Sequence, residues 1–280
     1  MNQQEELVIE SGRSSLHYWM DLWRYRELFV VLAWRDLSVR YKQTLLGVLW
    51  AIIPPFATML IMTVVFSKVA GLPSQDNVPY AIMVFTALLP WQFFASSIGA
   101  VGNSLLGSSH LISKVYFPRL IIPASSIIVC LCDSFISIFI LFGLMVWYSF
   151  LPSPALLLFP LLLAATALTA FGPGLLLSSL NIKYRDFRFV IPFIVQFGLY
   201  ASPVGFSSHV VREKFGESLF NLYCLNPMVG IIEGFRWCLL GGKPVLDLHH
   251  FLLGFTVSIV FLWLGLSYFR KTERSFADAI

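Results

Sequence analysis

The sequence predicts an all-α integral membrane protein with six transmembrane helices, an N-terminal amphipathic interfacial helix and re-entrant extracytoplasmic helices before the last span. Hydrophobic residues make up 58% of the 280 residues and charged residues only 12%, whereas a soluble globular chain averages about 25% charged residues. The mean hydropathy is +0.78. The basic residues lie in short flanks between apolar stretches, which is typical of membrane helices and argues against a nucleic-acid partner.

Six apolar segments reach the length of about 20 residues that is needed to cross a hydrocarbon core about 30 Å thick. They are Leu46–Ser67, Tyr80–Asn103, Leu120–Trp147, Ala155–Leu180, Phe189–Phe206 and His250–Phe269. The fifth is the shortest and contains Pro192 and Pro203, so we expect it to be broken or partly re-entrant. Polar residues interrupt Leu219–Leu240, which predicts one or two short re-entrant helices.

The distribution of Lys and Arg predicts the orientation of these spans. Most of the 19 basic residues fall on the side that also holds both termini, which places both termini in the cytoplasm. The N-terminus is polar and acidic, so we expect no cleavable signal peptide. The chain shows no internal repeat. We therefore expect one transmembrane domain over residues 1–280: a cytoplasmic or interfacial segment (1–45), a six-span bundle (46–270) and a cytoplasmic tail (271–280).

An amphipathic helix is predicted before the first span. At about 100° per residue, its apolar stripe consists of Trp19, Trp23, Val30, Trp34, Leu37 and Tyr41. Arg24, Arg35 and Lys42 point elsewhere. Trp on one face and Arg on another favour a helix at the membrane surface, where it could contact anionic lipid headgroups, a lipid pyrophosphate among them. A simple interfacial anchor fits the pattern equally well.

One acidic residue, Asp133, lies inside a predicted span. An ionisable group there is costly and should face a cavity or a partner. It is either a proton or cation site or a hydrogen-bonded group at a helix contact beside Ser134 or Ser137. The absence of Lys, Arg or His elsewhere in the spans favours the second interpretation.

Cys224 and Cys238 fall on the oxidising side in this topology. A disulfide between them is one alternative. Two buried thiols are the favoured one, because free Cys packs as a small hydrophobe.

Four short motifs occur in order along the chain. The first is RYKQTLLGVLWAIIPP (Arg40–Pro55), in which Gly47 permits a turn from the surface helix into the first span. The others are YRD (Tyr184–Asp186), NPM (Asn226–Met228) and ERSFADAI (Glu273–Ile280). With the topology above, they resemble the permeases of ABC-type polysaccharide exporters, which move lipid-linked O-antigen, capsule or teichoic-acid chains. The resemblance covers essentially the whole chain.

That resemblance implies a bacterial inner-membrane protein that exports lipid-linked polysaccharide from the cytoplasm to the outer face of the membrane. It implies a homodimer of permeases with two copies of a separate ATPase, which would hold ATP and Mg²⁺. It also implies that Leu46 and Gly47 form a gate for substrate entry beside the surface helix, near Arg40 and Trp34.

The sequence itself gives no sign of catalysis. A phosphate-binding Gly-x-x-x-x-Gly-Lys-Ser/Thr string is absent, and the nearest run, Gly241–Pro244, lacks both the loop length and the hydroxyl. His, Cys and carboxylate residues form no cluster suited to metal binding or covalent catalysis. We expect a transport subunit with no cofactor of its own.

Two loops are candidates for contact with an ATPase. Ser104–Arg119 is expected to form a short transverse helix stopped by Pro118, and Asn181–Arg188 carries a compact charged patch. The candidate coupling residues are Lys114, Tyr116, Tyr184, Arg185 and Asp186. The alternative is that both loops only anchor the orientation through their positive charges.

Trp91, Phe93 and Phe94, beside Gln92, lie near the middle of the second span. Sugars stack on aromatic faces, and interfacial belts do not explain aromatics at a helix centre. We interpret these residues as candidates for channel lining, although helix packing is the commoner reason for such residues.

Three other functions are alternatives for such a chain. A secondary transporter predicts inverted-repeat symmetry and several intramembrane charges, and neither is visible. A membrane-embedded transferase needs paired carboxylates or His near an interface, and His249 and His250 have no obvious companions. An ABC-type permease that exports a drug or small lipid is the serious alternative, because composition does not name the cargo.

Overall fold

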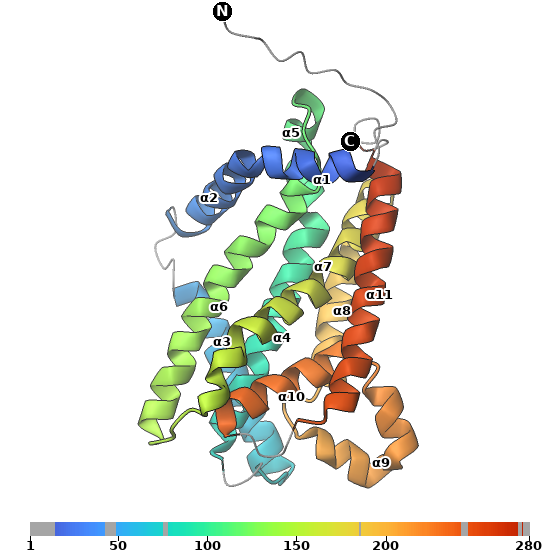
Figure 1. Ribbon diagram of the computed structural model, residues 1–280. Helices are drawn as coiled ribbons and strands as arrows, with labels where there is room; N and C mark the ends of the chain where they lie inside the picture. Colours follow the sequence, from blue (N-terminus) through green and yellow to red (C-terminus); the bar gives the residue numbers. More distant parts are fainter. Residues whose placement is uncertain are drawn as a thin grey trace, which may run out of the picture.

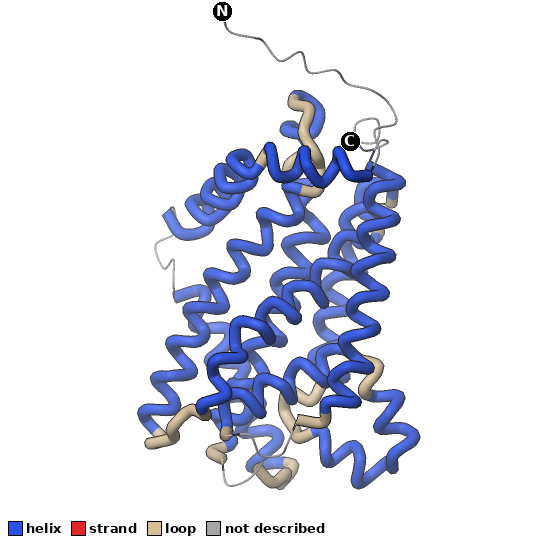
Figure 2. Tube along the Cα trace, in the orientation of Figure 1, coloured by secondary structure: helices blue, strands red, loops and turns tan. Residues whose placement is uncertain are grey.

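Every element in the described part of the chain is a helix (Figures 1 and 2). The structure is a computed structural model that describes residues 15–42, 49–74, 78–184, 186–241, 246–273 and 276. In chain order the elements are α1 (Ser15–Arg24), α2 (Arg26–Lys42), α3 (Leu49–Met62), the π-helix η1 (Thr63–Val69), α4 (Tyr80–Gly107), α5 (Ser109–Lys114), α6 (Ile121–Trp147), the 3-10 helix η2 (Pro154–Leu158), α7 (Phe159–Lys183), α8 (Phe187–Ala201), α9 (Ser208–Tyr223), α10 (Pro227–Leu240) and α11 (Leu248–Thr272).

Five helical stretches in the described residues are long and apolar enough to cross a membrane. They are Ala51–Val69, Tyr80–Gly107, Ile121–Trp147, Pro154–Lys183 and Leu248–Thr272. These stretches coincide with the first four predicted spans and the last, so the chain is a multi-pass α-helical membrane protein. The first of them was predicted as one spanning helix, but its last seven residues, η1, form a π-helix.

The fifth predicted span, Phe189–Phe206, is helical only as far as Ala201, in line with the expectation that it is broken. Helix α8 ends at Ala201 and has 15 residues, which gives a length of about 22 Å. Non-helical backbone at membrane depth is tolerated where it is buried in protein and its polar groups are bonded. Ser202–Gly205 are buried. Arg236 of α10 donates to the carbonyls of Val204 and Phe206.

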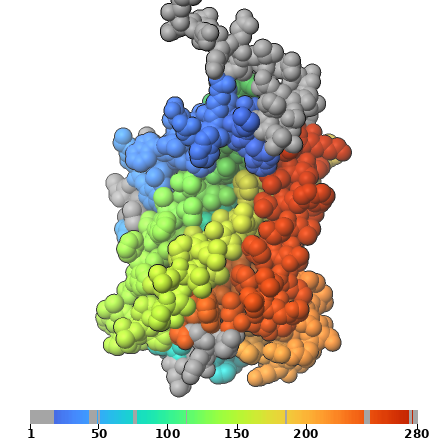
Figure 3. All heavy atoms as spheres, in the orientation of Figure 1, coloured from blue at the N-terminus to red at the C-terminus, as the bar shows by residue number. Residues whose placement is uncertain are grey.

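The long helices form a bundle around α4, which is the most buried of the five apolar stretches. It packs against α3, α6, α7, α8 and α10. On one face of the molecule α7 crosses diagonally between α6 and α11 (Figure 3, yellow-green between green and red). At the crossing of α7 with α11, a Cβ added to Gly265 would lie 2.2 Å from the carbonyl oxygen of Gly172. Two glycines therefore let these backbones touch, as small residues do in membrane bundles.

The predicted surface helix is present as two helices, α1 and α2, separated by a turn at Tyr25. They lie across one end of the bundle, where α5 and the C-terminal end of α11 also lie (Figure 1). We call this the α1 end. Leu32 and Ala33 pack inward, whereas Trp23 and Trp34 are 74% and 69% exposed. The division between packed and uncovered residues is therefore not the predicted one: Trp34 of the predicted apolar stripe and Arg35 of the basic face are both exposed, and Leu32 and Ala33 were not part of the stripe.

The opposite end, which we call the α9 end, carries α9, α10 and the start of α11 (Figure 1). The region Leu219–Leu240 was predicted to hold one or two short helices, and it contains the last turn of α9 and all of α10. Asn226 caps α10 by accepting a hydrogen bond from the backbone N–H of Met228 at 3.1 Å, and Pro227 occupies the first helical position. The Asn226 amide also donates to Ser202 Oγ at 3.0 Å. The NPM motif therefore both starts α10 and holds the loop that follows α8.

Candidate functional site

Asp133 of α6 bonds to the last turn of α2. Its Oδ2 lies 2.5 Å from Nη2 of Arg40, and the Tyr41 hydroxyl donates to its Oδ1. The Asp133 side chain is 16% exposed and that of Arg40 is 49% exposed. This ion pair connects the end of α2 to a point about halfway along α6.

Asp133 is hydrogen-bonded at a helix contact, as the favoured interpretation of the sequence expected, but neither interpretation named Arg40 as its partner. Ser134 and Ser137 donate to backbone carbonyls of α6 and not to the carboxylate. The cation that offsets the charge comes from outside the spans. The signal was available, because an acid inside a membrane requires a partner and Arg40 precedes the first span.

Two of the four predicted gate residues are described. Arg40 is part of the ion pair, and Trp34 lies two turns earlier on α2 with its side chain 69% exposed. Leu46 and Gly47 fall in residues 43–48, outside the described residues. The ion pair therefore fixes the position of the chain at Arg40, seven residues before Gly47.

A stripe of uncovered aromatic side chains runs along α8. Phe189, Phe193, Phe197 and Tyr200 are 70%, 58%, 59% and 63% exposed. Their spacings of four, four and three residues place them on one helix face. The rings of Phe193 and Phe197 are 4.2 Å apart between centroids, and the exposed Gln196 lies beside them. We call Phe189, Phe193, Phe197 and Tyr200 the α8 stripe.

Trp91, Phe93 and Phe94 do not lie on an uncovered face. They are 4%, 1% and 8% exposed and belong to the main hydrophobic core. The Trp91 ring packs against α8 from behind: a Cβ added to Gly198 would lie 2.6 Å from its Cη2 atom. This burial favours the helix-packing alternative for the three residues. The spacing of the α8 stripe is visible in the sequence, but the prediction did not include these residues.

Four of the five candidate coupling residues are described, and they are exposed. Lys114 ends α5, and Tyr116 in the following loop is 66% exposed. Tyr184 is 49% exposed, with the Lys183 ammonium 5.3 Å from its ring centroid. Asp186 is exposed, and Arg185 lies outside the described residues. Both loops lie at the α1 end, so the two predicted patches are on the same side of the bundle (Figure 1).

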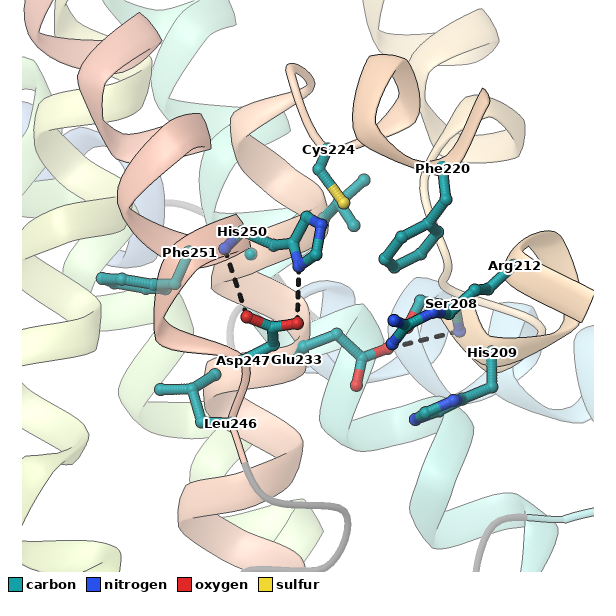
Figure 4. A pocket seen from close by; sticks show the side chains of 12 residues that line it. Ser208, His209, Arg212, Phe220, Cys224, Glu233, Leu246, Asp247, His250 and Phe251 are labelled. Carbon is teal, nitrogen blue, oxygen red and sulfur yellow. Dashed lines mark hydrogen bonds and ion pairs between the residues drawn. The ribbon is translucent and has the colours of Figure 1, made fainter. Parts of the chain in front are cut away.

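A cavity of about 130 Å³ lies at the α9 end between α9, α10 and the start of α11 (Figure 4). Its charged groups bond to the protein itself. His250 lies 2.6 Å from Asp247 through Nδ1 and 2.8 Å from Asn221 through Nε2, and Glu233 lies 3.1 Å from Arg236. The contact between Asn221 and His250 joins α9 to α11, whereas the pair of Glu233 and Arg236 lies within α10.

The thiols at this end are not paired. Cys224 lines the cavity, and both Cys224 and Cys238 are free. Burial, with the nearby Asp247 and Glu233 carboxylates, raises the pKa of the Cys224 thiol to about 11. The described residues contain no group of three His, Cys, Asp or Glu side chains that could hold a metal ion.

The chain belongs to the ABC-2 type transporter family, whose sequence profile matches residues 27–240. The matched segment runs from the start of α2 to the end of α10. The family is one of membrane transport subunits, which agrees with a chain that carries no ATP-binding motif.

Relatives of known name align over nearly the full chain. The O-antigen export system permease protein RfbA of Myxococcus xanthus is 26% identical over 261 residues, covering 93% of this chain and 98% of the relative. The protein of the same name from Klebsiella pneumoniae is 28% identical, covering 91% and 95%. The polysialic acid transport protein KpsM of Escherichia coli is 23% identical, covering 86% and 92%.

Proposed function

We propose that this chain is the membrane-spanning subunit of an ATP-driven exporter that moves lipid-linked polysaccharide from the cytoplasm to the outer face of the inner membrane. The observation that carries the proposal is the end-to-end similarity to permeases named for O-antigen export and polysialic acid transport. It favours a polysaccharide over the drug or small lipid of the alternative hypothesis.

The proposed topology has six crossings. The bundle helices alternate in direction in the order α3, α4, α6, α7, α8 and α11 (Figure 1). Helix α8 is short, and its crossing is completed by Ser202–Phe206, whose carbonyls bond to Arg236 and Tyr80. Basic residues gather at the α1 end, in α2, α5 and the last turn of α11. This end, with both termini, is therefore the cytoplasmic one, and α9 and α10 are re-entrant from the outer side.

The α8 stripe is the proposed lining of the polysaccharide path. A pyranose ring buries its C–H face on an aromatic ring, and exposed Gln196 and Tyr200 supply hydrogen bonds beside it. Interfacial aromatic belts do not account for a stripe along a whole helix. In one copy of the chain the stripe is uncovered, so a second copy is proposed to face it and enclose the path.

The partner ATPase is proposed to dock at the α1 end. Lys114 and Tyr116 form an exposed tip, and Tyr184 with Asp186 forms a second patch. Exposed Tyr side chains are good anchors in protein interfaces. We propose two permeases and two ATPase subunits, with ATP and Mg²⁺ bound by the ATPase. Substrate would enter beside α2, where Trp34 and Arg40 flank the gate formed by Leu46 and Gly47.

The proposal is tested by deleting the gene in the source organism and restoring it on a plasmid. The expected result is loss of surface polysaccharide with accumulation of the lipid-linked chain inside the cell, reversed by the restored gene. Unchanged surface polysaccharide, together with new sensitivity to a drug or loss of an exported lipid, would support the alternative cargo.

A further inference from the structure

The end of α11 is joined to two other elements through one carboxylate. Glu273 Oε1 accepts a hydrogen bond from the Tyr18 hydroxyl of α1 at 3.2 Å. The same atom accepts one from the backbone N–H of Arg119, in the loop between α5 and α6, at 2.8 Å. The Arg119 guanidinium also donates to the backbone carbonyl of Glu273. Glu273 therefore links α1, the α5–α6 loop and α11.

Packed rings surround this carboxylate. Phe276 is 1% exposed and meets Phe269 edge-on at 5.3 Å between centroids. The Arg119 guanidinium lies 5.9 Å from the Phe276 ring centroid, and that of Arg270 lies 4.9 Å from the Tyr18 ring centroid. Burial raises the pKa of the Glu273 carboxyl, against the opposing effect of its bonds to Arg119 and Tyr18. We call Tyr18, Arg119, Glu273 and Phe276 the junction.

The junction lies directly behind the exposed tip of the α5–α6 loop. Tyr116 is uncovered, while the next residue, Phe117, is 4% exposed and anchors the loop in the second hydrophobic cluster. Arg119 follows two residues later. A displacement of the tip thus reaches the backbone N–H of Arg119 through a short, packed segment, and Glu273 connects that N–H to the Tyr18 hydroxyl of α1.

We propose that Glu273 is a positioning residue that couples the α5–α6 loop to α1, so that ATP-driven movement of the loop displaces the surface helix. The inference rests on the proposed function, in which this loop contacts the ATPase and the surface helix borders the entry of the substrate. Glu273 itself touches neither ATP nor polysaccharide. A residue that only closed the end of the bundle would affect folding and assembly but not the number of transport events per ATP.

The first test compares variants in the complete complex of permease and ATPase, reconstituted in vesicles. Glu273→Ala removes the shared acceptor, and Tyr18→Phe removes only the bond to α1. Glu273→Gln keeps a carbonyl oxygen where Oε1 lies, and Glu213→Gln changes an exposed carboxylate on α9 as a control. Assembly, ATP hydrolysis and polysaccharide moved per ATP are measured for each.

Glu273→Ala should lower polysaccharide moved per ATP at least about fivefold, the lower range of a typical coupling effect. Tyr18→Phe should lower it by a smaller factor, while Glu273→Gln and Glu213→Gln stay within about twofold of the unmodified complex. Unchanged transport per ATP in both Glu273→Ala and Tyr18→Phe would overturn the inference. If Glu273→Ala fails to assemble, Tyr18→Phe decides alone.

The second test does not depend on the cargo. Hydrogen exchange of the purified permease without its ATPase should show faster exchange in α1 for Glu273→Ala and Tyr18→Phe, with α9 unchanged. Equal protection of α1 in all variants would contradict the junction. If the unmodified complex moves no polysaccharide, the proposed function fails, while the exchange result still decides whether Glu273 holds α1.

Discussion

The ion pair between Asp133 and Arg40 shows how a charge is accommodated inside an apolar helix. A carboxylate at that depth is costly without a partner, and here the partner is carried by α2 on a segment that packs against α6. The pair is half open on the Arg40 side, so its contribution is smaller than that of a fully buried pair. Its main effect is to fix the end of α2 relative to α6.

A double-mutant cycle tests this coupling. Asp133→Asn and Arg40→Gln should each lower the melting temperature of the purified protein, because each leaves one charged partner without the other. The double variant should be at least as stable as the less stable of the two single variants, which corresponds to a coupling energy of about 1 kcal/mol between the two side chains. Additive losses in the thermal unfolding series would show that the two side chains act independently.

Cys224 offers a test of packing at the α9 end. Since its thiol pKa is raised to about 11 and the reactive form is the thiolate, it should react slowly with a maleimide at neutral pH and faster as the pH rises toward 11. Leu219→Cys, at a position 52% exposed on α9, is the control and should react quickly. Rapid labelling of Cys224, or a mass that reports a disulfide with Cys238, would contradict the packing described.

At the scale of the element, α8 has two faces with different neighbours. Its uncovered face carries the α8 stripe, and its packed face rests on Trp91 at Gly198. The core aromatics therefore position the helix, while the stripe is proposed to meet the cargo.

For the stripe, Phe193→Ala and Phe197→Ala should each lower polysaccharide transport severalfold without lowering ATP hydrolysis, because each removes a stacking surface worth about 1 kcal/mol or more. Phe139→Ala is the matched control, since Phe139 lies on α6 and is 75% exposed. Transport and hydrolysis are measured in the reconstituted complex. Equal effects of all three changes would mean that α8 faces lipid in the same way as α6.

For the packed face, Gly198→Val should push α8 away from Trp91 and lower transport, because overpacking a core costs about 1–3 kcal/mol. Adding Trp91→Phe, which removes the Cη2 atom that the new side chain meets, should restore part of the activity. Gly143→Ala on α6 is the control, since a Cβ there meets nothing within 4 Å. No rescue in the double variant would place the cause of the loss elsewhere.

These elements also show what the sequence can and cannot predict. The spans that became α4, α6, α7 and α11 were predictable because hydropathy over about 20 residues depends on composition alone. A break in the fifth span was expected from its prolines, but the contacts that stabilise it were not, because Ser202–Phe206 is bonded by Arg236 and Tyr80 from distant segments. The face of an aromatic residue is equally non-local: Trp91 and Phe193 both lie in apolar helices, and only their neighbours make one buried and the other uncovered.

At the scale of the whole molecule, the surface helices and the helices α9 and α10 lie at opposite ends of the bundle. The α1 end carries the surface helices, the exposed loops and the junction around Glu273, and the α9 end carries α9, α10 and the bonded loop after α8 (Figure 1). The α8 stripe runs between them. This arrangement suits a subunit that receives movement at one end and releases cargo at the other.

The central claim is that the chain forms a polysaccharide path driven by a separate ATPase. It is tested most directly by ATP-dependent movement of lipid-linked polysaccharide across vesicles that contain the purified permease, with and without its ATPase. We predict movement only when both proteins and ATP are present, and no ATP hydrolysis by the permease alone. Hydrolysis by the permease alone, or a complete complex that hydrolyses ATP and leaves the polysaccharide on its original side, would contradict the account.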